Sequence, residues 1–173
     1  ISPQAVIMAG GMGTRLRPLT DELPKPMLPV GDRPLLELII DQLKQAGISR
    51  VNLTTHYKKE AIIEHFGDGN DFGVDIRYVE EDQPLGTAGA LSLLGGPVDE
   101  PLLVINGDIL TRVDFRAMHK FHQDHEADMT IAVRQYEIQI PYGVIENEGA
   151  NVTGITEKPQ VYHLINAGIY LLE

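Results

Sequence analysis

A cluster of glycines and cations near the start of the chain has the composition of an anion-binding loop. A short apolar segment, residues 5–9, leads into Gly10, Gly11, Gly13, Arg15, Arg17 and Lys25. Glycine permits positive φ and lets the backbone approach a ligand closely. A turn of this kind lines up backbone N–H groups into a nest for anions. We therefore expect a buried strand that feeds a phosphate-binding loop, with a di- or triphosphate as its ligand.

Two common phosphate-binding motifs are absent from this loop. A P-loop needs a lysine followed by Ser or Thr, and no lysine in this sequence is followed by either residue. A Rossmann fingerprint would need a third glycine at position 16, where the chain has Leu16. The loop belongs to another class of phosphate site.

The loop resembles the signature of the sugar-1-phosphate nucleotidyltransferases, also called nucleotide-sugar pyrophosphorylases. Their pattern is G-G-x-G-T-R-L-x-P-L-T followed by P-K-P, two hydrophobic residues and P-V, and residues 10–20 and 24–30 match it nearly residue for residue. The pattern is closest to that of mannose- and heptose-1-phosphate guanylyltransferases. The resemblance implies that Arg15 and Lys25 are catalytic. It also implies that the nucleotide is bound by Ala9, Gly10, Gly11, Met12, Gly13 and Thr14.

Asp108 is the candidate metal ligand. It follows the fully apolar residues 102–105 and is preceded by Gly107, so we expect it at the carboxyl end of a central strand, where open α/β sheets bind ligands. Mg²⁺ commonly takes one or two carboxylates together with phosphate oxygens and water. The family, by resemblance, holds its metal with an Asp in a similar segment, and Asp108 is therefore also predicted to be catalytic.

The family also uses a second metal-ligand Asp, and no candidate for it precedes residue 173. We therefore expect residues 1–173 to form a nucleotidyltransferase catalytic domain that is incomplete at its C-terminus and was excised from a longer chain.

Residues 80–90, EEDQPLGTAGA, resemble the family's base-recognition segment. The residue five before Gly86 usually reads the base, and here it is Glu81. A carboxylate only accepts hydrogen bonds, which suits the adjacent N1–H and N2–H₂ donors of guanine, whereas uracil and thymine offer a single N3–H. This favours GTP, with Gly86 and Thr87 as further nucleotide contacts. An alternative stays open, in which Glu81 is solvated and a neighbour reads the base.

Three short segments near the end of the chain resemble the family's sugar-phosphate half-site. They are YGV at 142–144, EKP at 157–159 and NAGIY at 166–170. By resemblance, Lys158 holds the sugar phosphate, Glu157 and Asn166 bind sugar hydroxyls, and the Gly143 backbone approaches the sugar. Because Pro159 disfavours the helical conformation in the residue before it, we expect Lys158 to project from an extended strand.

Apolar periodicity predicts strands that alternate with helices. The expected helices are residues 34–46, 59–66 and 114–125, and the expected strands are 5–9, 51–55, 74–79, 102–105 and 129–133. After residue 142 the pattern changes to strands with short connections, at 143–146, 152–157 and 165–172. The predicted fold class is α/β: a Rossmann-like, mostly parallel sheet flanked by helices, with an antiparallel excursion near the C-terminal end. His119, His122 and His125 fall on one expected helix, where a packed or solvated face is favoured over a metal site.

Composition limits the classes of partner. The chain has 173 residues, 43% of them hydrophobic, which is enough for one α/β domain with one core. The absence of cysteine excludes disulfides and zinc-thiolate sites and favours a cytoplasmic setting. A net charge of −11 argues against nucleic acid, and no apolar run is long enough to predict a membrane span. A homo-oligomer and additional domains on a longer chain remain open.

The predicted reaction joins a nucleoside triphosphate to a sugar 1-phosphate and releases pyrophosphate. A phosphate monoester is already a nucleophile at neutral pH, so cations and positioning carry the catalysis and no general base is needed. One alternative is a metal-dependent glycosyltransferase that uses a nucleotide-sugar donor, which has less need of Lys25. Another is a non-catalytic nucleotide-sugar sensor, which could dispense with Arg15, Lys25 or Asp108, yet the sequence has all three.

Overall fold

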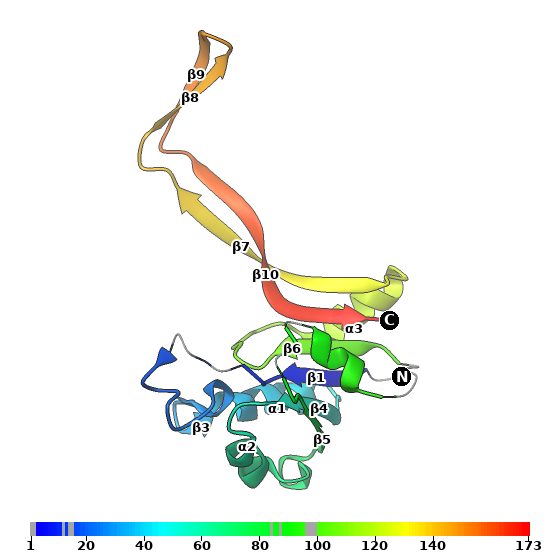
Figure 1. The fold of residues 1–173 in the computed structure, drawn as a ribbon. Coiled ribbons are helices and arrows are strands. Elements are labelled where there is room, and N and C mark those ends of the chain that lie inside the picture. The colour runs from blue at the N-terminus through cyan, green and yellow to red at the C-terminus, as the bar shows by residue number, and fades with distance from the viewer. Residues whose placement is uncertain (1–2, 12, 14–15, 84, 87, 96–99) are drawn as a thin grey trace. The chain divides into compact units, whose positions relative to one another are not determined.

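The chain forms two compact units in the computed structural model, which describes residues 3–11, 13, 16–83, 85–86, 88–95 and 100–173. One unit comprises Ile1–Ala132 together with Gly168–Glu173, and the other comprises Val133–Ala167. Figure 1 shows the elements along the chain.

The first unit alternates strands and helices as the apolar periodicity predicts. Its strands are β1 (Gln4–Met8), β2 (Pro29–Val30), β3 (Arg33–Pro34), β4 (Arg50–Thr55), β5 (Asp75–Glu80) and β6 (Leu102–Asn106). Its helices are α1 (Leu35–Gln45), α2 (Lys59–Phe66) and α3 (Phe115–Asp124), with short 3₁₀ helices η2 (Lys25–Met27), η3 (Asn70–Phe72) and η4 (Gly89–Leu93). The strands β7 (Met129–Gln139) and β10 (Gln160–Leu172) run through both units.

The central sheet has the strand order β5-β4-β1-β6-β10-β7. β1 pairs in parallel with β4 and with β6, and β4 pairs in parallel with β5, whereas β10 runs antiparallel to β6. Counted along the chain, the parallel strands are therefore arranged third, second, first, fourth, and the winding reverses between β1 and β6. This confirms the predicted mostly parallel, Rossmann-like α/β fold.

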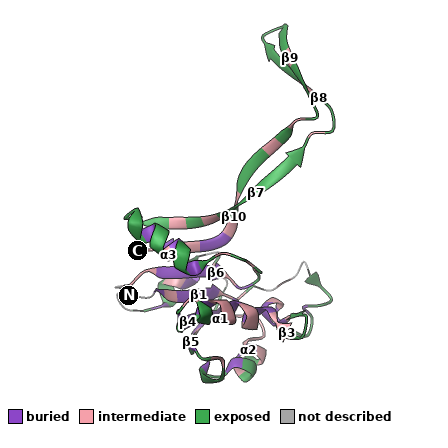
Figure 2. Cartoon of the chain, turned by 180° about the vertical axis from the view of Figure 1, so that it is seen from behind, coloured by how far each residue is buried: buried purple, intermediate pink, exposed green. Residues whose placement is uncertain are grey.

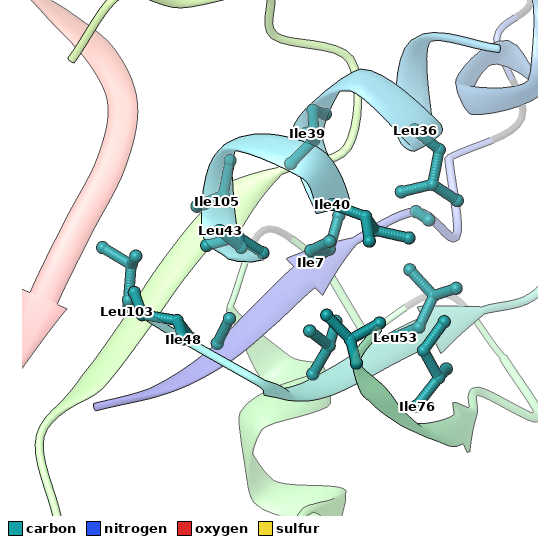
Figure 3. Packing of buried hydrophobic residues seen from close by; sticks show 14 of the residues in the cluster. Ile7, Leu36, Ile39, Ile40, Leu43, Ile48, Leu53, Ile76, Leu103 and Ile105 are labelled. Atoms are coloured by element: carbon teal, nitrogen blue, oxygen red, sulfur yellow. The ribbon is translucent and has the colours of Figure 1, made fainter. Parts of the chain in front are cut away.

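One face of the sheet is covered by α1 (Figure 3). Leu36, Ile39, Ile40 and Leu43 recur at the spacing of one helix face and are all buried. Figure 3 shows them packed over the strands with Ile7, Leu53 and Ile105, among other core residues. Burying a side chain of this size stabilises a protein by about 1.5–3 kcal/mol. This packing fixes the strands on which the site is built.

The helix bounds lie close to those expected, and one of the three helices has a capping side chain at its start. α1 begins after Pro34, one residue later than the expected 34–46, and α2 has the bounds expected. α3 begins after Asp114, whose side chain accepts hydrogen bonds from the backbone N–H groups of Arg116 and Ala117. Asp114 is thus an N-cap rather than the first helical residue.

Of the three histidines predicted on this helix, His122 is packed inside the protein, whereas His125, the residue after α3, is exposed. His122 is only 1% exposed, with Nδ1 2.7 Å from Thr130 Oγ1 and Nε2 3.0 Å from Glu173 Oε1. Burial lowers the pKa of His119. Among the described residues, no three His, Cys, Asp or Glu side chains are grouped to hold a metal ion. None of the helices formed by these residues is both long and apolar enough to cross a membrane.

The second unit is an antiparallel excursion, which the sequence also predicts. β8 (Gly143–Glu148) pairs antiparallel with β9 (Asn151–Glu157), and Ile145 lies opposite Ile155. A register shift occurs between Glu146 and Asn147. Figure 2 shows that both strands are largely exposed, in contrast to the buried strands β1 and β6. With each face open to water, this hairpin has little core of its own.

Gly107 controls how closely the ends of β1 and β6 approach. A Cβ at this position would lie 2.8 Å from Met8 O and 3.1 Å from Ala9 Cα, both backbone atoms. We predict that Gly107→Ala lowers the free energy of unfolding by about 1–3 kcal/mol, the usual cost of overpacking. Denaturant unfolding measures the change.

Gly11→Ala is the matched control for stability, because a Cβ there meets no heavy atom within 4 Å. Its effect on the free energy of unfolding should stay within about 0.5 kcal/mol. Equal unfolding free energies for the two variants would contradict the steric role of Gly107.

Candidate nucleotide site

A cavity of about 370 Å³ lies at the carboxyl ends of the parallel strands. It is lined by Met8, Gly10, Gly11, Thr54, Glu81, Gly86 and Asn106, all in the first unit. These residues belong to or follow β1, β4, β5 and β6. In open α/β sheets, ligands bind outside the carboxyl ends of strands where the winding reverses. The cavity lies at that position and has the volume of a small-molecule site.

Glu81 is held in the wall of this cavity. The residue is only 9% exposed, and its Oε2 accepts a hydrogen bond from the Leu85 backbone N–H at 3.2 Å. Its own backbone N–H donates to Thr55 O at 3.0 Å, which extends the strand pairing by one residue. The alternative of a fully solvated Glu81 is therefore wrong in this structure.

Gly10 faces the Glu81 carboxylate. A Cβ on Gly10 would lie 2.8 Å from Glu81 Oε1, so no side chain fits between them. The residue before it, Ala9, is buried, and its N–H donates to Thr54 O at 3.2 Å. The glycine thus leaves both its own backbone and the carboxylate available at the cavity surface.

The rest of the glycine-rich loop is shaped by Thr20. Gly13 has a φ of +61°, and its carbonyl accepts a hydrogen bond from Thr20 Oγ1 at 2.8 Å. Thr20 is 1% exposed. Gly86, on the other side of the cavity, also has a positive φ, +80°. The predicted site residues Met12, Thr14, Arg15 and Thr87 lie outside the described residues.

Lys25 and Asp108 form an ion pair close to the cavity. Asp108 follows the cavity-lining Asn106 by two residues in the sequence. Lys25 Nζ lies 2.5 Å from Asp108 Oδ2, and the two side chains are 33% and 40% exposed. Asp108 is brought there by the end of β6, and Lys25 by η2 at the end of the glycine-rich loop. Two predicted catalytic residues, 83 positions apart in sequence, are thus in direct contact.

Asp108 suits a hard cation. Its carboxylate is accessible and follows a strand end, and Mg²⁺ typically binds one or two protein carboxylates while phosphate oxygens and water complete its shell. Within the described part of the chain, Asp108 does not belong to a group of three or more His, Cys, Asp or Glu side chains that could hold a metal ion. The donor set here fits a metal that is completed by a bound phosphate.

The predicted sugar-phosphate residues all lie in the second unit. Gly143 is opposite Glu157 in the β8–β9 pairing, and a Cβ on Gly143 would lie 3.1 Å from Glu157 Oε2. Lys158 follows directly, and Asn166 lies further along on β10. The structure thus brings Gly143, Glu157 and Lys158 together at one end of the hairpin.

The expectation that Lys158 projects from an extended strand is wrong. Lys158 has a φ of +46°, in the left-handed region, and lies between β9 and β10. Its N–H donates to Tyr142 O at 3.2 Å, and Ile140 N–H donates to Pro159 O at 3.0 Å. Pro159 does exclude the right-handed helical conformation, but these two hydrogen bonds select a bend rather than a strand.

Residues at or just after the ends of β4 and β6 also belong to the site and were not predicted. Thr54 and Asn106 line the cavity, and His56 Nδ1 donates to Glu81 O at 2.7 Å. The available signal is positional: β4 is a parallel strand, so residues at its carboxyl end reach the same edge of the sheet. No residue type in this segment marks it as part of a phosphate site.

The fold is an open α/β fold with a cavity outside the carboxyl ends of its parallel strands, the position at which proteins of this architecture bind ligands. The sequence profile of the family described as nucleotidyl transferase matches residues 4–173. The chain belongs to this family, and the predicted resemblance is confirmed.

The relatives carry guanylyltransferase names. The chain is 38% identical over 178 residues to a "Probable mannose-1-phosphate guanylyltransferase 1" of Oryza sativa subsp. japonica, covering 98% of this chain and 49% of that protein. It is 38% identical over 172 residues to a D-glycero-alpha-D-manno-heptose 1-phosphate guanylyltransferase of Aneurinibacillus thermoaerophilus, covering 97% of this chain and 74% of that protein. The chain therefore spans about half the length of the first of these relatives.

A solved structure shares the fold. HddC from Yersinia pseudotuberculosis matches with a TM-score of 0.76 and 30% identity over 99% of this chain and 76% of that one. The same protein has been solved complexed with GMP-PN, and that structure matches with a TM-score of 0.71 and 28% identity.

The contact between Gly10 and Glu81 yields a prediction on nucleotide binding. Gly10→Ala places a methyl group 2.8 Å from Glu81 Oε1, so the carboxylate must move. We expect the Kd for a nucleoside triphosphate to rise at least about tenfold, corresponding to a loss of about 1.4 kcal/mol of binding free energy. Isothermal titration calorimetry measures the constant.

A double-variant cycle supplies the control. If Gly10→Ala acts by displacing the carboxylate, it should add little to the effect of Glu81→Ala, so the two changes are not additive. Fully additive losses in binding free energy would show that the methyl group acts on something other than Glu81.

Proposed function

We propose that the protein to which this chain belongs transfers a nucleotidyl group from GTP to a sugar 1-phosphate and releases pyrophosphate. The observation that carries the proposal is the pairing of Lys25 with Asp108 beside a cavity at the reversal of strand order. A cation and a carboxylate at this position are suited to a polyphosphate and its metal ion. Family membership supports the same reaction class.

GTP is proposed because of Glu81. Its carboxylate is buried in the cavity wall, and its Oε2 accepts a hydrogen bond from Leu85 N–H. An ionised carboxylate has about four acceptor positions, so it can also accept hydrogen bonds from donors on a base. Guanine presents adjacent N1–H and N2–H₂ groups to such an acceptor. The guanylyltransferase names of the relatives and the GMP-PN complex of HddC support this choice of base.

The chemistry needs charge stabilisation rather than a base. An oxygen of the sugar phosphate attacks the α-phosphorus in line, the bond to the bridging oxygen breaks, and pyrophosphate leaves with the electron pair. Lys25 would stabilise charge on the α-phosphoryl group, and Arg15 with the loop N–H groups would hold the departing phosphates. Mg²⁺, held by Asp108 when bound, would supply further positive charge to the phosphates.

The sugar phosphate is proposed to bind residues of the second unit. Lys158 would pair with the phosphate, Glu157 and Asn166 with sugar hydroxyls, and Gly143 would leave room for the sugar beside its backbone. The left-handed φ of Lys158 supports a special role, because strained backbone of this kind concentrates at functional sites.

The lack of cysteine supports a cytoplasmic location for the reaction.

A nucleotide panel tests the proposal on the full-length protein. With Mg²⁺ and mannose 1-phosphate or a heptose 1-phosphate, GTP should give pyrophosphate at a kcat/KM at least about tenfold above that for UTP or dTTP, since hydrogen bonds to a charged group are worth about 1.5–3 kcal/mol. A coupled assay for pyrophosphate measures the rates. Tight GTP binding without pyrophosphate release would instead favour a nucleotide-sugar sensor.

Lys25→Ala tests the catalytic cation. Losing one preorganised charge-stabilising group should lower kcat by about 10²–10³. Because its ion pair with Asp108 is substantially exposed, the free energy of unfolding should change by about 1 kcal/mol or less. Steady-state kinetics and denaturant unfolding measure both quantities.

Lys120→Ala is the matched control, since Lys120 Nζ also pairs with a carboxylate, Asp124, but on the exposed face of α3. It should leave kcat unchanged. A Lys25→Ala enzyme with wild-type kcat would exclude the proposed role.

A further inference from the structure

The segment after β4 reaches across to the glycine-rich loop and binds its backbone. Tyr57 Oη donates a hydrogen bond to Thr20 O at 3.3 Å. Lys58 Nζ donates to Asp21 O at 2.5 Å and to Glu22 O at 3.0 Å. Two adjacent side chains thus hold three successive backbone carbonyls from a part of the chain about 36 positions away.

Lys58 binds the peptide backbone rather than neutralising an acid. Lys58 Nζ donates to main-chain oxygens, although the residues that carry them are the acidic Asp21 and Glu22. The carboxylate of Asp21 lies instead 3.6 Å from Arg17 Nε. A lysine used in this way fixes the path of a loop, because each of its donors defines the position of a carbonyl group.

The backbone of Lys58 is itself in an unusual conformation. Its φ and ψ are 51° and 43°, the left-handed region, at the residue that precedes α2. A non-glycine residue is kept in this region only where its surroundings over-determine it, and such residues concentrate at functional sites. Glycine would be more easily accommodated there, so the presence of lysine is consistent with a role for the side-chain hydrogen bonds that Lys58 makes.

The carbonyls held by Tyr57 and Lys58 are connected to the nucleotide cavity through Thr20. Thr20 is buried and donates from Oγ1 to Gly13 O at 2.8 Å. A Cβ on Gly13 would lie 2.8 Å from Thr20 Cγ2 and 3.3 Å from Lys25 Cβ, so Gly13 packs closely against both Thr20 and Lys25. Displacing Thr20 would therefore disturb both the glycine-rich turn and the base of the Lys25 side chain.

We propose that Lys58, assisted by Tyr57, is a positioning residue for this nucleotidyl transfer. It holds Thr20–Glu22 and, through Thr20, sets the positions of Gly13 and Lys25 relative to the reacting phosphates. The inference rests on the proposed function. Neither residue touches the reacting atoms; their contribution is to reduce the number of conformations that the loop adopts before the phosphates bind.

Three variants of the full-length protein test the role. Lys58→Met keeps an unbranched side chain but removes the donors, and Lys58→Arg restores donors. Lys59→Met is the matched control, because Lys59 Nζ pairs instead with the Glu80 carboxylate at 2.7 Å. Measurements are kcat and KM for GTP, the thermal midpoint, and hydrogen exchange of the backbone amides of Leu16, Leu19 and Asp21, which are hydrogen-bonded within the loop.

Lys58→Met should lower kcat by about 10- to 100-fold, the cost of misplacing a catalytic group. Its loop amides should exchange at least about tenfold faster, which a loss of about 1.4 kcal/mol in local stability would produce. The thermal midpoint should stay close to wild type, Lys58→Arg should recover most of kcat, and Lys59→Met should match wild type.

The experiment distinguishes failure of the proposed function from failure of the positioning role of Lys58. An inactive wild-type protein would contradict the proposed function, while amide exchange would still report whether Lys58 orders the loop. Wild-type kcat in Lys58→Met, or a loss of kcat with unchanged loop exchange, would overturn the positioning role. A lowered thermal midpoint with exchange accelerated throughout the first unit would also overturn it, in favour of general stabilisation.

Discussion

The close approach of two backbone segments at the ends of β1 and β6 is the constraint on which the site depends. Gly107 N–H donates to Met8 O at 2.9 Å, and no Cβ fits at position 107 without meeting backbone atoms. Because the strands meet in this way, the glycine-rich loop that follows β1 and the carboxylate that follows β6 start from the same point. Lys25 and Asp108 can then form their 2.5 Å ion pair although they lie far apart in sequence.

The groups expected to attract phosphates lie in one loop of a chain whose net charge is negative. The whole sequence carries a net charge of −11, so its overall field repels a nucleoside triphosphate. Attraction must come from backbone N–H groups and a few cations in the glycine-rich loop, where they act over short distances. Because these interactions act over short distances, the N–H groups and cations of the loop must be held in the correct positions to bind the phosphates. Thr20, Tyr57 and Lys58 add hydrogen bonds that hold the loop, and a loop held in place loses less conformational entropy when its ligand binds.

Much of the fold could be predicted because the longer helices and strands of the first unit have regularly spaced apolar residues or a short apolar run, as α1 does with Leu36, Ile40 and Leu43. Lys25 and Asp108 could be named from residue type and motif. Their contact could not, because it depends on the register in which β1 pairs with β6. The left-handed conformations of Lys58 and Lys158 were also missed, since lysine has no preference for that region and long-range hydrogen bonds impose it. The burial of Glu81 likewise follows from packing against Gly10, which no local pattern encodes.

A crystal structure of the full-length protein with a non-hydrolysable GTP analogue and Mg²⁺ tests most directly whether the strand-end cavity is the nucleotide site. The guanine edge should lie within about 2.6–3.2 Å of the Glu81 carboxylate, with the phosphates along the glycine-rich loop and next to Lys25. A nucleotide bound away from Glu81, for instance in the separate cavity lined by Gln42 and Arg116, would contradict the account.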